Sequence, residues 1–302
     1  MDFRLPAPDA TGYADVDGVQ IAWQSFGVGE SAVLVVPTWN FVDSRVSAPL
    51  VPDLAPWFRV VTFDPRGAGR SDRPSTGYRF SDHMADAVAV MRAACIDRAS
   101  LIAASNGSNV AALLAARLPQ LVERLVLIDP AIAVGPEARS EDDDDDAFWL
   151  ERASYQGWER WSAPYWRADW PGFARWFLET AFNESDSEAV VEAVLRIALE
   201  ADPEMLIQEH VEWHAGRDFQ SIPPLLGSIA SPTLVLHGAL DLSVPLEAGE
   251  AVAAMIPGAT LAVAVAGGHR PDIRSPELIN PLFVDFLRGR LPTYRPGLEI
   301  RS

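Results

Sequence analysis

The chain has no lysine, a single cysteine and no long apolar run. All 24 basic side chains are therefore arginine; they face 42 Asp and Glu, and the formal net charge is −18. A protein with this charge is repelled by nucleic-acid phosphates and by anionic membrane surfaces. No apolar stretch approaches the roughly 18 residues that a membrane-spanning helix requires. We therefore expect neither a nucleic-acid partner nor a membrane partner.

Because Cys95 is the only cysteine, no disulfide can form within the chain. It lies in an apolar helical pattern and is interpreted as a small core residue. Cysteines at metal-site spacing are lacking, and the N-terminus has no basic region followed by an apolar stretch, which a secretory signal would show. These features favour a cytoplasmic protein with no metal and no cofactor. The oligomeric state is not indicated.

Six short aliphatic runs, each bounded by turn residues, predict strands that are buried on both faces of a sheet. Helical patterns lie between them. Strands that alternate with helices predict an α/β fold with a doubly wound, mostly parallel sheet. The predicted strands are 33–36, 60–63, 101–104, 125–128, 233–236 and 261–265, and the predicted helices of the core are 80–95, 106–117, 246–255 and 276–287.

The middle of the chain, residues 136–221, contains helical periodicity but no strand pattern. We expect an all-helical lid there, inserted between a first core segment (1–135) and a second core segment (222–302). The acidic run 141–146 is typical of a solvated, mobile linker rather than of a metal site. Helices are predicted within the lid at 147–161, 172–182, 187–199 and 203–213.

Ser105 lies in the segment AASNGS, residues 103–108, between a predicted strand and a predicted helix. Small neighbours allow the sharp turn that brings the two backbones together and lifts the hydroxyl out of the sheet. The turn also puts the hydroxyl at a helix N-terminus, where developing negative charge is stabilised. A serine that begins a helix is also a common N-cap. This motif alone therefore leaves a nucleophile and a cap both open.

Two later loops carry an acid and a base. Asp241 follows the strand that ends at His237-Gly238, and His269 lies in the segment GGHRP after the last predicted strand. Sites of open α/β sheets lie beyond the carboxyl ends of the strands, so both side chains are expected at the edge where Ser105 emerges. We predict Ser105 as nucleophile, His269 as general base and Asp241 as the acid that orients the histidine. Asp129, which also follows a strand, is the alternative acid.

With these motifs, the chain resembles the α/β-hydrolase superfamily over nearly its whole length. The order Ser, Asp, His along the chain is that of the superfamily. The segment FDPRGAGRS, residues 63–71, is similar to its D-x-R-G-x-G-x-S turn, which is structural in those proteins. Epoxide hydrolases and haloalkane dehalogenases of this superfamily use an aspartate nucleophile. The resemblance together with Ser105 therefore implies acyl chemistry, with an acyl-enzyme formed on the serine.

The loop after the first predicted strand departs from the family pattern. Relatives usually carry His-Gly there, whereas this chain has Pro37 and Thr38. By alignment with the family, the backbone N–H groups of Trp39 and Asn106 form the oxyanion hole. The Asn40 side chain is an additional candidate donor. The departure keeps a second class open, a small-molecule-binding or receptor-like protein with weak or no turnover, although a binding pocket has no need of an intact triad.

Six of the ten tryptophans lie in the predicted lid. They can pack the lid or form an apolar pocket wall between lid and core. We assign Trp166, Trp170 and Trp176 to the substrate pocket, together with Asn40. Such a pocket favours a bulky, apolar ester or lactone as the small-molecule substrate. Macrocyclic lactones are among the substrates of esterases that resemble this chain, whose lid pattern is similar to that of bacterial esterase-like hydrolases.

The remaining histidines are expected to be structural. His237 ends a strand, and His83 is predicted to lie on a surface helix. His210 and His214 are four residues apart, a spacing that can bind zinc. The sequence offers them no evident third ligand, so we expect both on the surface of the lid.

Overall fold

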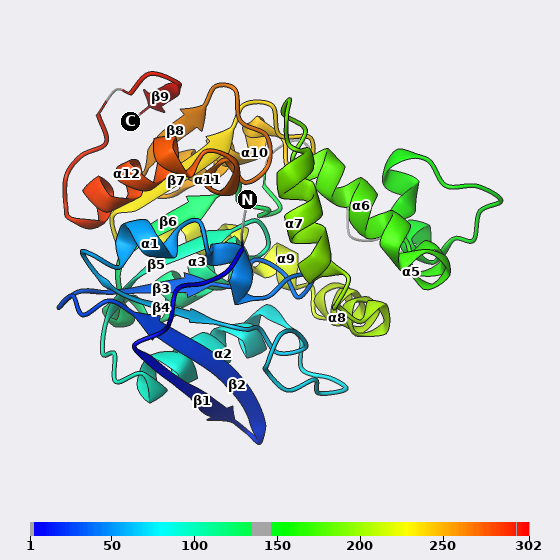
Figure 1. Cartoon of the computed structure of the whole chain (residues 1–302), viewed down its shortest axis with the longest axis horizontal. Helices are drawn as coiled ribbons and strands as arrows, with labels where there is room; N and C mark the ends of the chain where they lie inside the picture. Colours follow the sequence, from blue (N-terminus) through cyan, green and yellow to red (C-terminus); the bar gives the residue numbers. More distant parts are fainter. Residues whose placement is uncertain (1–2, 135–145, 294, 302) are drawn as a thin grey trace.

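A single twisted sheet carries the fold (Figure 1). In the computed structural model, which describes residues 3–134, 146–293 and 295–301, nine strands pair in the order β1-β2-β4-β3-β5-β6-β7-β8-β9. The strands from β4 to β8 in this order run parallel, whereas β1, β2 and β9 pair antiparallel at the two edges. The bounds are Ala10–Val16 (β1), Val19–Phe26 (β2), Ala32–Val36 (β3), Arg59–Phe63 (β4), Ala99–Ala104 (β5), Val122–Ile128 (β6), Thr233–Gly238 (β7), Thr260–Ala264 (β8) and Leu298–Arg301 (β9). The predicted α/β class with a mostly parallel sheet is confirmed.

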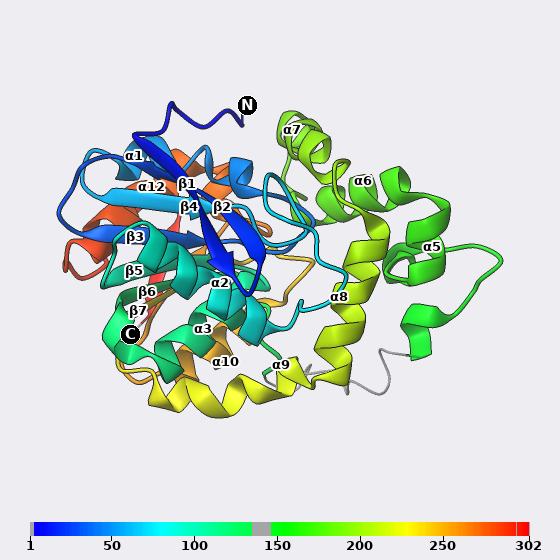
Figure 2. The same cartoon turned by 90° about the horizontal axis from the view of Figure 1, so that it is seen from below.

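Helices cover both faces of the sheet (Figure 2). On one face lie α2 (Phe80–Ala93), α3 (Gly107–Arg117) and α10 (Leu246–Met255), and on the other lie α1 (Val51–Leu54) and α12 (Pro276–Leu287). Neighbouring residues of one strand are therefore buried in different cores: Leu101 packs with the first set of helices and Ile102 with the second. This explains why the parallel strands are uninterrupted aliphatic runs.

Between β6 and β7 the described residues form helices and loops only. These are α5 (Ala163–Ala168), α6 (Trp170–Ala181), α7 (Glu188–Ala198), α8 (Pro203–Ala215) and α9 (Asp218–Ser221). We refer to residues 146–221 as the lid. Both views show α5 to α8 beyond one end of the sheet (Figures 1 and 2). Of the acidic run 141–146, only Asp146 is among the described residues.

The predicted lid helix 147–161 is wrong, because this segment has only a helical turn at 146–149 and the 3₁₀ helix η3 (Gly157–Arg160). Three further short helices join the elements: η1 (Ser44–Ser47), η2 (Pro119–Leu121) and η4 (Pro223–Ser228), while α11 (Pro271–Arg274) leads into α12. The expected burial of Cys95 is also wrong. It follows α2 with a positive φ of 54° and is exposed, so it is not a core residue. Within the described residues, every helix is too short or too polar to traverse a lipid bilayer.

Candidate active site

Ser105 occupies the turn between β5 and α3 in a left-handed backbone conformation, with φ of 51°. Its N–H donates to the carbonyl of Ile128 at 2.8 Å, which ties the turn to β6. A Cβ on Gly107 would lie 2.2 Å from the carbonyl oxygen of Pro37, so only glycine fits at this point of the turn. Non-glycine residues adopt this conformation at a cost that the surrounding structure must offset, and such strain concentrates at functional sites.

Asp241 and His269 form a buried pair on adjacent loops. Nδ1 of His269 lies 2.7 Å from Oδ2 of Asp241, after β8 and β7 respectively. The other oxygen, Oδ1, accepts the backbone N–H groups of Ser243 at 2.7 Å and Val244 at 2.9 Å. These donors hold the carboxylate in place, so Asp241 can fix the orientation of the imidazole.

The two partners shift each other's protonation. Burial alone would lower the pKa of His269, but the charge and hydrogen bond of Asp241 outweigh burial and the pKa of His269 is raised. Burial alone would raise the pKa of Asp241, but His269 and the backbone donors outweigh it and that pKa is lowered. The pair therefore favours an ionised aspartate beside an imidazole that protonates readily, as a general base requires.

Asp129, the alternative acid, is also close to this pair but is engaged elsewhere. Its two oxygens accept the backbone N–H groups of Gly238 and Arg270, each at 2.8 Å. Burial raises its pKa to about 6. Oxygens of Asp129 and Asp241 and a nitrogen of His269 lie within 4.8 Å of one another and could in principle hold a metal ion. Backbone N–H groups and the imidazole already occupy the carboxylate oxygens, so this donor set fits a triad better than a metal.

Ser105 and His269 follow β5 and β8 at the same edge of the sheet, as predicted. Within the described residues, no hydrogen bond joins the Ser105 hydroxyl to the imidazole. Catalytic hydrogen bonds of this kind often form only in the substrate complex.

The candidate oxyanion loop, Pro37 to Asn40, packs against the N-terminus of α3. Neither the Trp39 nor the Asn106 backbone N–H donates a hydrogen bond to any described residue. Both groups are thus available to an incoming oxyanion. The side chain of Asn40, in contrast, points to the lid, where Nδ2 contacts Sδ of Met205 at 3.7 Å.

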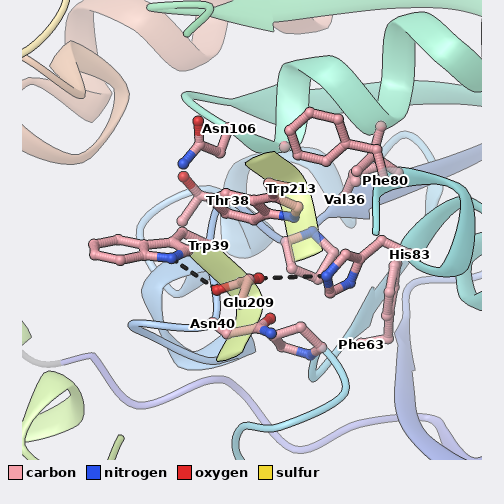
Figure 3. Close-up of a pocket in the computed structure, with 14 residues that line it drawn as sticks. Val36, Thr38, Trp39, Asn40, Phe63, Phe80, His83, Asn106, Glu209 and Trp213 are labelled. Atoms are coloured by element: carbon pink, nitrogen blue, oxygen red, sulfur yellow. Dashed lines mark hydrogen bonds and ion pairs between the residues drawn. The ribbon is translucent and has the colours of Figure 1, made fainter. Parts of the chain in front are cut away.

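A cavity with about 340 Å³ of empty space, partly open to solvent, adjoins this loop (Figure 3). Its wall combines the oxyanion loop and the start of α3 with residues from α2 and α8. A second cavity lies behind the same loop. Neither cavity is lined by Ser105 or His269. The lining of the first cavity includes Trp39, Asn40, His83, Asn106, Glu209 and Trp213.

The lid tryptophans assigned to the pocket lie in an aromatic cluster. Trp166 is 1% exposed and Trp170 8% exposed, and both pack on Phe173. Neither lines the two cavities. Their surroundings are those of packing residues. Trp176 is half-buried at the margin of the cluster, beside Arg160.

Polar residues by which the lid contacts the candidate oxyanion loop were not predicted from the sequence. Glu209 is 1% exposed and accepts the indole N–H of Trp39. His83 is not on an open surface; its imidazole packs beside Glu209, and burial lowers its pKa to about 3. His210 is also buried, stacked between Phe148 and His214. A polar residue on an amphipathic helix is predicted to be exposed unless its hydrogen-bond partner is known. Here that partner lies far away in the sequence.

Comparison with known proteins identifies the family. The alpha/beta hydrolase fold family matches residues 32–271, so the chain belongs to this family. It is 27% identical to the putative carbamate hydrolase RutD of Caulobacter sp. over 88% of this chain and 89% of that protein. It is 30% identical to 2-hydroxymuconate semialdehyde hydrolase of Pseudomonas sp. over 79% of each. The enol-lactonase from Burkholderia xenovorans superposes with a TM-score of 0.77 at 25% identity, over 92% of this chain and all of that one. The protein is thus a member of a family of hydrolases.

Proposed function

We propose that this protein is a serine hydrolase that cleaves a carboxylic ester or a lactone through an acyl-enzyme on Ser105. The observation that carries the proposal is the buried His269–Asp241 pair at 2.7 Å, at the same sheet edge as a strained Ser105. A strained serine at the end of a parallel strand, an imidazole held by a carboxylate and two free backbone donors are the parts that acyl transfer needs.

In the proposed cycle, Nε2 of His269 accepts the Ser105 proton while the serine oxygen attacks the carbonyl carbon. The backbone N–H groups of Trp39 and Asn106 stabilise the oxyanion of the tetrahedral intermediate. His269 then protonates the leaving alcohol oxygen, and the acyl group stays on Ser105. Water activated by His269 adds to the acyl-enzyme and releases the acid.

The proposed substrate class is a bulky, apolar ester or lactone, because aromatic side chains of the lid pack on the candidate oxyanion loop. The cavities beside this loop do not include Ser105, so they set no upper limit on substrate size. A macrocyclic lactone is therefore kept within the proposed class. A panel of esters and lactones graded in size tests this point: preference for the smallest members would contradict it.

The alternative function, a small-molecule-binding protein, is favoured by one observation: neither cavity is lined by Ser105. Reaction with a fluorophosphonate separates the two functions. We expect a covalent adduct that peptide mass spectrometry locates on Ser105, and no adduct in Ser105→Ala. Folded protein that binds esters but neither reacts with the probe nor turns them over would establish the binding protein instead.

A further inference from the structure

Helix α8 of the lid contacts the oxyanion loop at two points that are one helical turn apart. Oε2 of Glu209 accepts the indole N–H of Trp39 at 2.9 Å (Figure 3). Four residues earlier on the same face of the helix, Sδ of Met205 contacts the Asn40 amide. Two consecutive loop residues are therefore tied to one face of α8. One of them, Trp39, is the residue whose backbone N–H is the candidate oxyanion donor.

The Glu209 carboxyl is in an environment that favours its neutral form. It is 1% exposed, and burial raises its pKa well above the usual value. Nε2 of His83 lies 3.4 Å from Oε1, but burial keeps this imidazole uncharged, so it supplies no compensating cation. Since a buried carboxyl without a charged partner stays protonated, Glu209 acts as a neutral acceptor of the indole N–H and lies beside the uncharged imidazole.

Packing also holds the oxyanion loop. Pro37 and Thr38 stand where relatives carry histidine and glycine, and the loop continues directly into Trp39. The indole ring stacks on Phe41 and on Trp161 of the lid, with centroids 5.0 Å and 5.1 Å apart. Such apolar contacts bury the ring but have little directional preference. The hydrogen bond to Glu209 adds a directional constraint on the indole.

We propose that Glu209 is a positioning residue for the oxyanion hole: by holding the indole of Trp39 it fixes the direction of the Trp39 backbone N–H. The inference rests on the proposed function, because it presumes that this N–H stabilises a tetrahedral intermediate. Removal of a whole oxyanion donor costs about 10²–10³-fold in kcat. Loss of its alignment should cost less, about 10- to 100-fold.

Two substitutions at position 209 separate shape from hydrogen bonding. Glu209→Leu removes the acceptor and should lower kcat about 10- to 100-fold with little change in KM. Glu209→Gln keeps an acceptor for the indole and a donor toward His83, so it reproduces the neutral carboxyl. We expect Glu209→Gln to retain kcat within about threefold of the parent, since only the hydrogen bonds matter.

Glu212 provides the matched control on the same helix. Its carboxylate accepts the backbone N–H groups of Gly77 and Tyr78 at 2.9 Å and 2.6 Å, so it also joins α8 to the core, but away from the oxyanion loop. Glu212→Leu should lower the melting temperature and leave kcat nearly unchanged. If it lowers kcat as much as Glu209→Leu does, then Glu209 acts only by attaching the lid.

The coupling to Trp39 is tested by a double-mutant cycle. Trp39→Phe keeps the backbone donor and the stacked ring but removes the indole N–H. It should reproduce the kcat loss of Glu209→Leu, and adding Glu209→Leu to it should cost little more, since both changes break the same bond. Additive losses would overturn the proposal. Trp39→Phe also answers the question if Glu209→Leu does not fold.

Inhibitor affinity and probe labelling supply readouts that stability does not affect. A trifluoromethyl ketone, which forms an oxyanion on Ser105, should bind Glu209→Leu about as much more weakly as kcat falls, while the product acid binds as before. An effect confined to KM, and to substrates with one particular group, would instead show that Glu209 contacts the substrate and would overturn its positioning role.

If the parent does not react with a fluorophosphonate, the proposed function itself fails. If the parent and Glu209→Leu react equally fast, only the positioning role fails.

Discussion

Oε1 of Glu184 accepts the backbone N–H of Gly268, the residue before His269, at 2.7 Å. Two further contacts come from the end of α6 and the connection that follows it. The His269 N–H donates to the carbonyl of Ala181 at 2.9 Å, and the Asn183 amide donates to the carbonyl of Leu240 beside Asp241 at 2.9 Å. One lid segment thus holds the loops of both His269 and Asp241.

This relationship predicts that Glu184→Ala slows the reaction by loosening the His269 loop, although Glu184 is not expected to contact the substrate. A hydrogen bond to a charged acceptor contributes about 1.5–3 kcal/mol. If part of it orients His269, kcat should fall about tenfold, which corresponds to about 1.4 kcal/mol. Glu188→Ala, an exposed change in α7, is the control and should leave kcat unchanged. Steady-state kinetics on both variants check the prediction, and equal kcat values would refute it.

The strained backbone at Ser105 predicts a gain in stability when function is given up. Ser105→Gly removes the Cβ that disfavours the positive φ of 51°, which should stabilise the fold by about 1 kcal/mol. Turnover should be abolished, as in Ser105→Ala. Asp186→Gly, at a lid turn with φ of 63°, should stabilise without loss of activity. Chemical denaturation measures both changes; a Ser105→Gly variant that is less stable than the parent would contradict the argument.

The two buried aspartates should respond differently to substitution by asparagine. Asp241→Asn removes the charge that orients His269 and should lower kcat by about 10³–10⁴-fold. Asp129→Asn leaves one of its two backbone N–H partners poorly satisfied, so its main effect should be a lower melting temperature, with about 1–3 kcal/mol of stability lost. Kinetics per folded molecule decide between them. A larger kcat loss for Asp129→Asn would show that the acid has been misassigned.

The parallel strands at the centre of the sheet were predictable because both of their faces are buried, so each strand is a continuous aliphatic run. Such a run can be recognised without any periodicity, as Val33, Leu34, Leu101 and Ile102 show. The antiparallel strands β1, β2 and β9 were not predicted. The edge strand β1 has an exposed side with polar residues, as the segment ATGYADV shows, and the pairing of such strands depends on a neighbour rather than on local sequence. Tertiary contacts that override local pattern also explain the segment around Gly157 and Trp161, which joins the aromatic cluster through a short 3₁₀ helix instead of the predicted α-helix.

At the candidate site, sequence order and strand context predicted the Asp241–His269 contact and the loop position of Ser105. They could not predict Glu184 or Glu209. The partners of these carboxyl groups are backbone N–H or indole groups that lie between 84 and 170 residues away in the chain. Such contacts follow from how the lid sits on the core, which no local pattern encodes.

The ion pair predicts opposite effects of pH on rate and on stability. Because the pKa of His269 is raised by Asp241, the rate should rise with pH through a midpoint above the usual value of about 6.5. Stability should change in the other direction. The contribution of His269 is fully present below about pH 6.5 and is lost as pH rises through its higher folded pKa. The lowered pKa of Asp241 adds stability that is lost only as pH falls through that value.

An NMR titration of His269 measures the midpoint of its protonation. In Asp241→Asn, burial dominates and the midpoint should drop; an unchanged midpoint would exclude the pair as its cause.

The lid tryptophans provide the last prediction, in which burial separates packing from substrate choice. Trp166 is 1% exposed and touches aromatic rings of the lid and of the oxyanion loop. Trp166→Ala should therefore cost about 3–5 kcal/mol of stability. Trp176 is half-buried, so Trp176→Ala should cost clearly less stability.

Trp166→Phe retains most of the packing and controls for the empty space that truncation to alanine would leave. Melting temperatures and a panel of esters measured on the three variants test the assignment. If Trp166→Phe changes the substrate ranking at a melting temperature close to that of the parent, Trp166 contacts the substrate. If the ranking is unchanged and Trp166→Ala loses much stability, Trp166 is a packing residue of the lid.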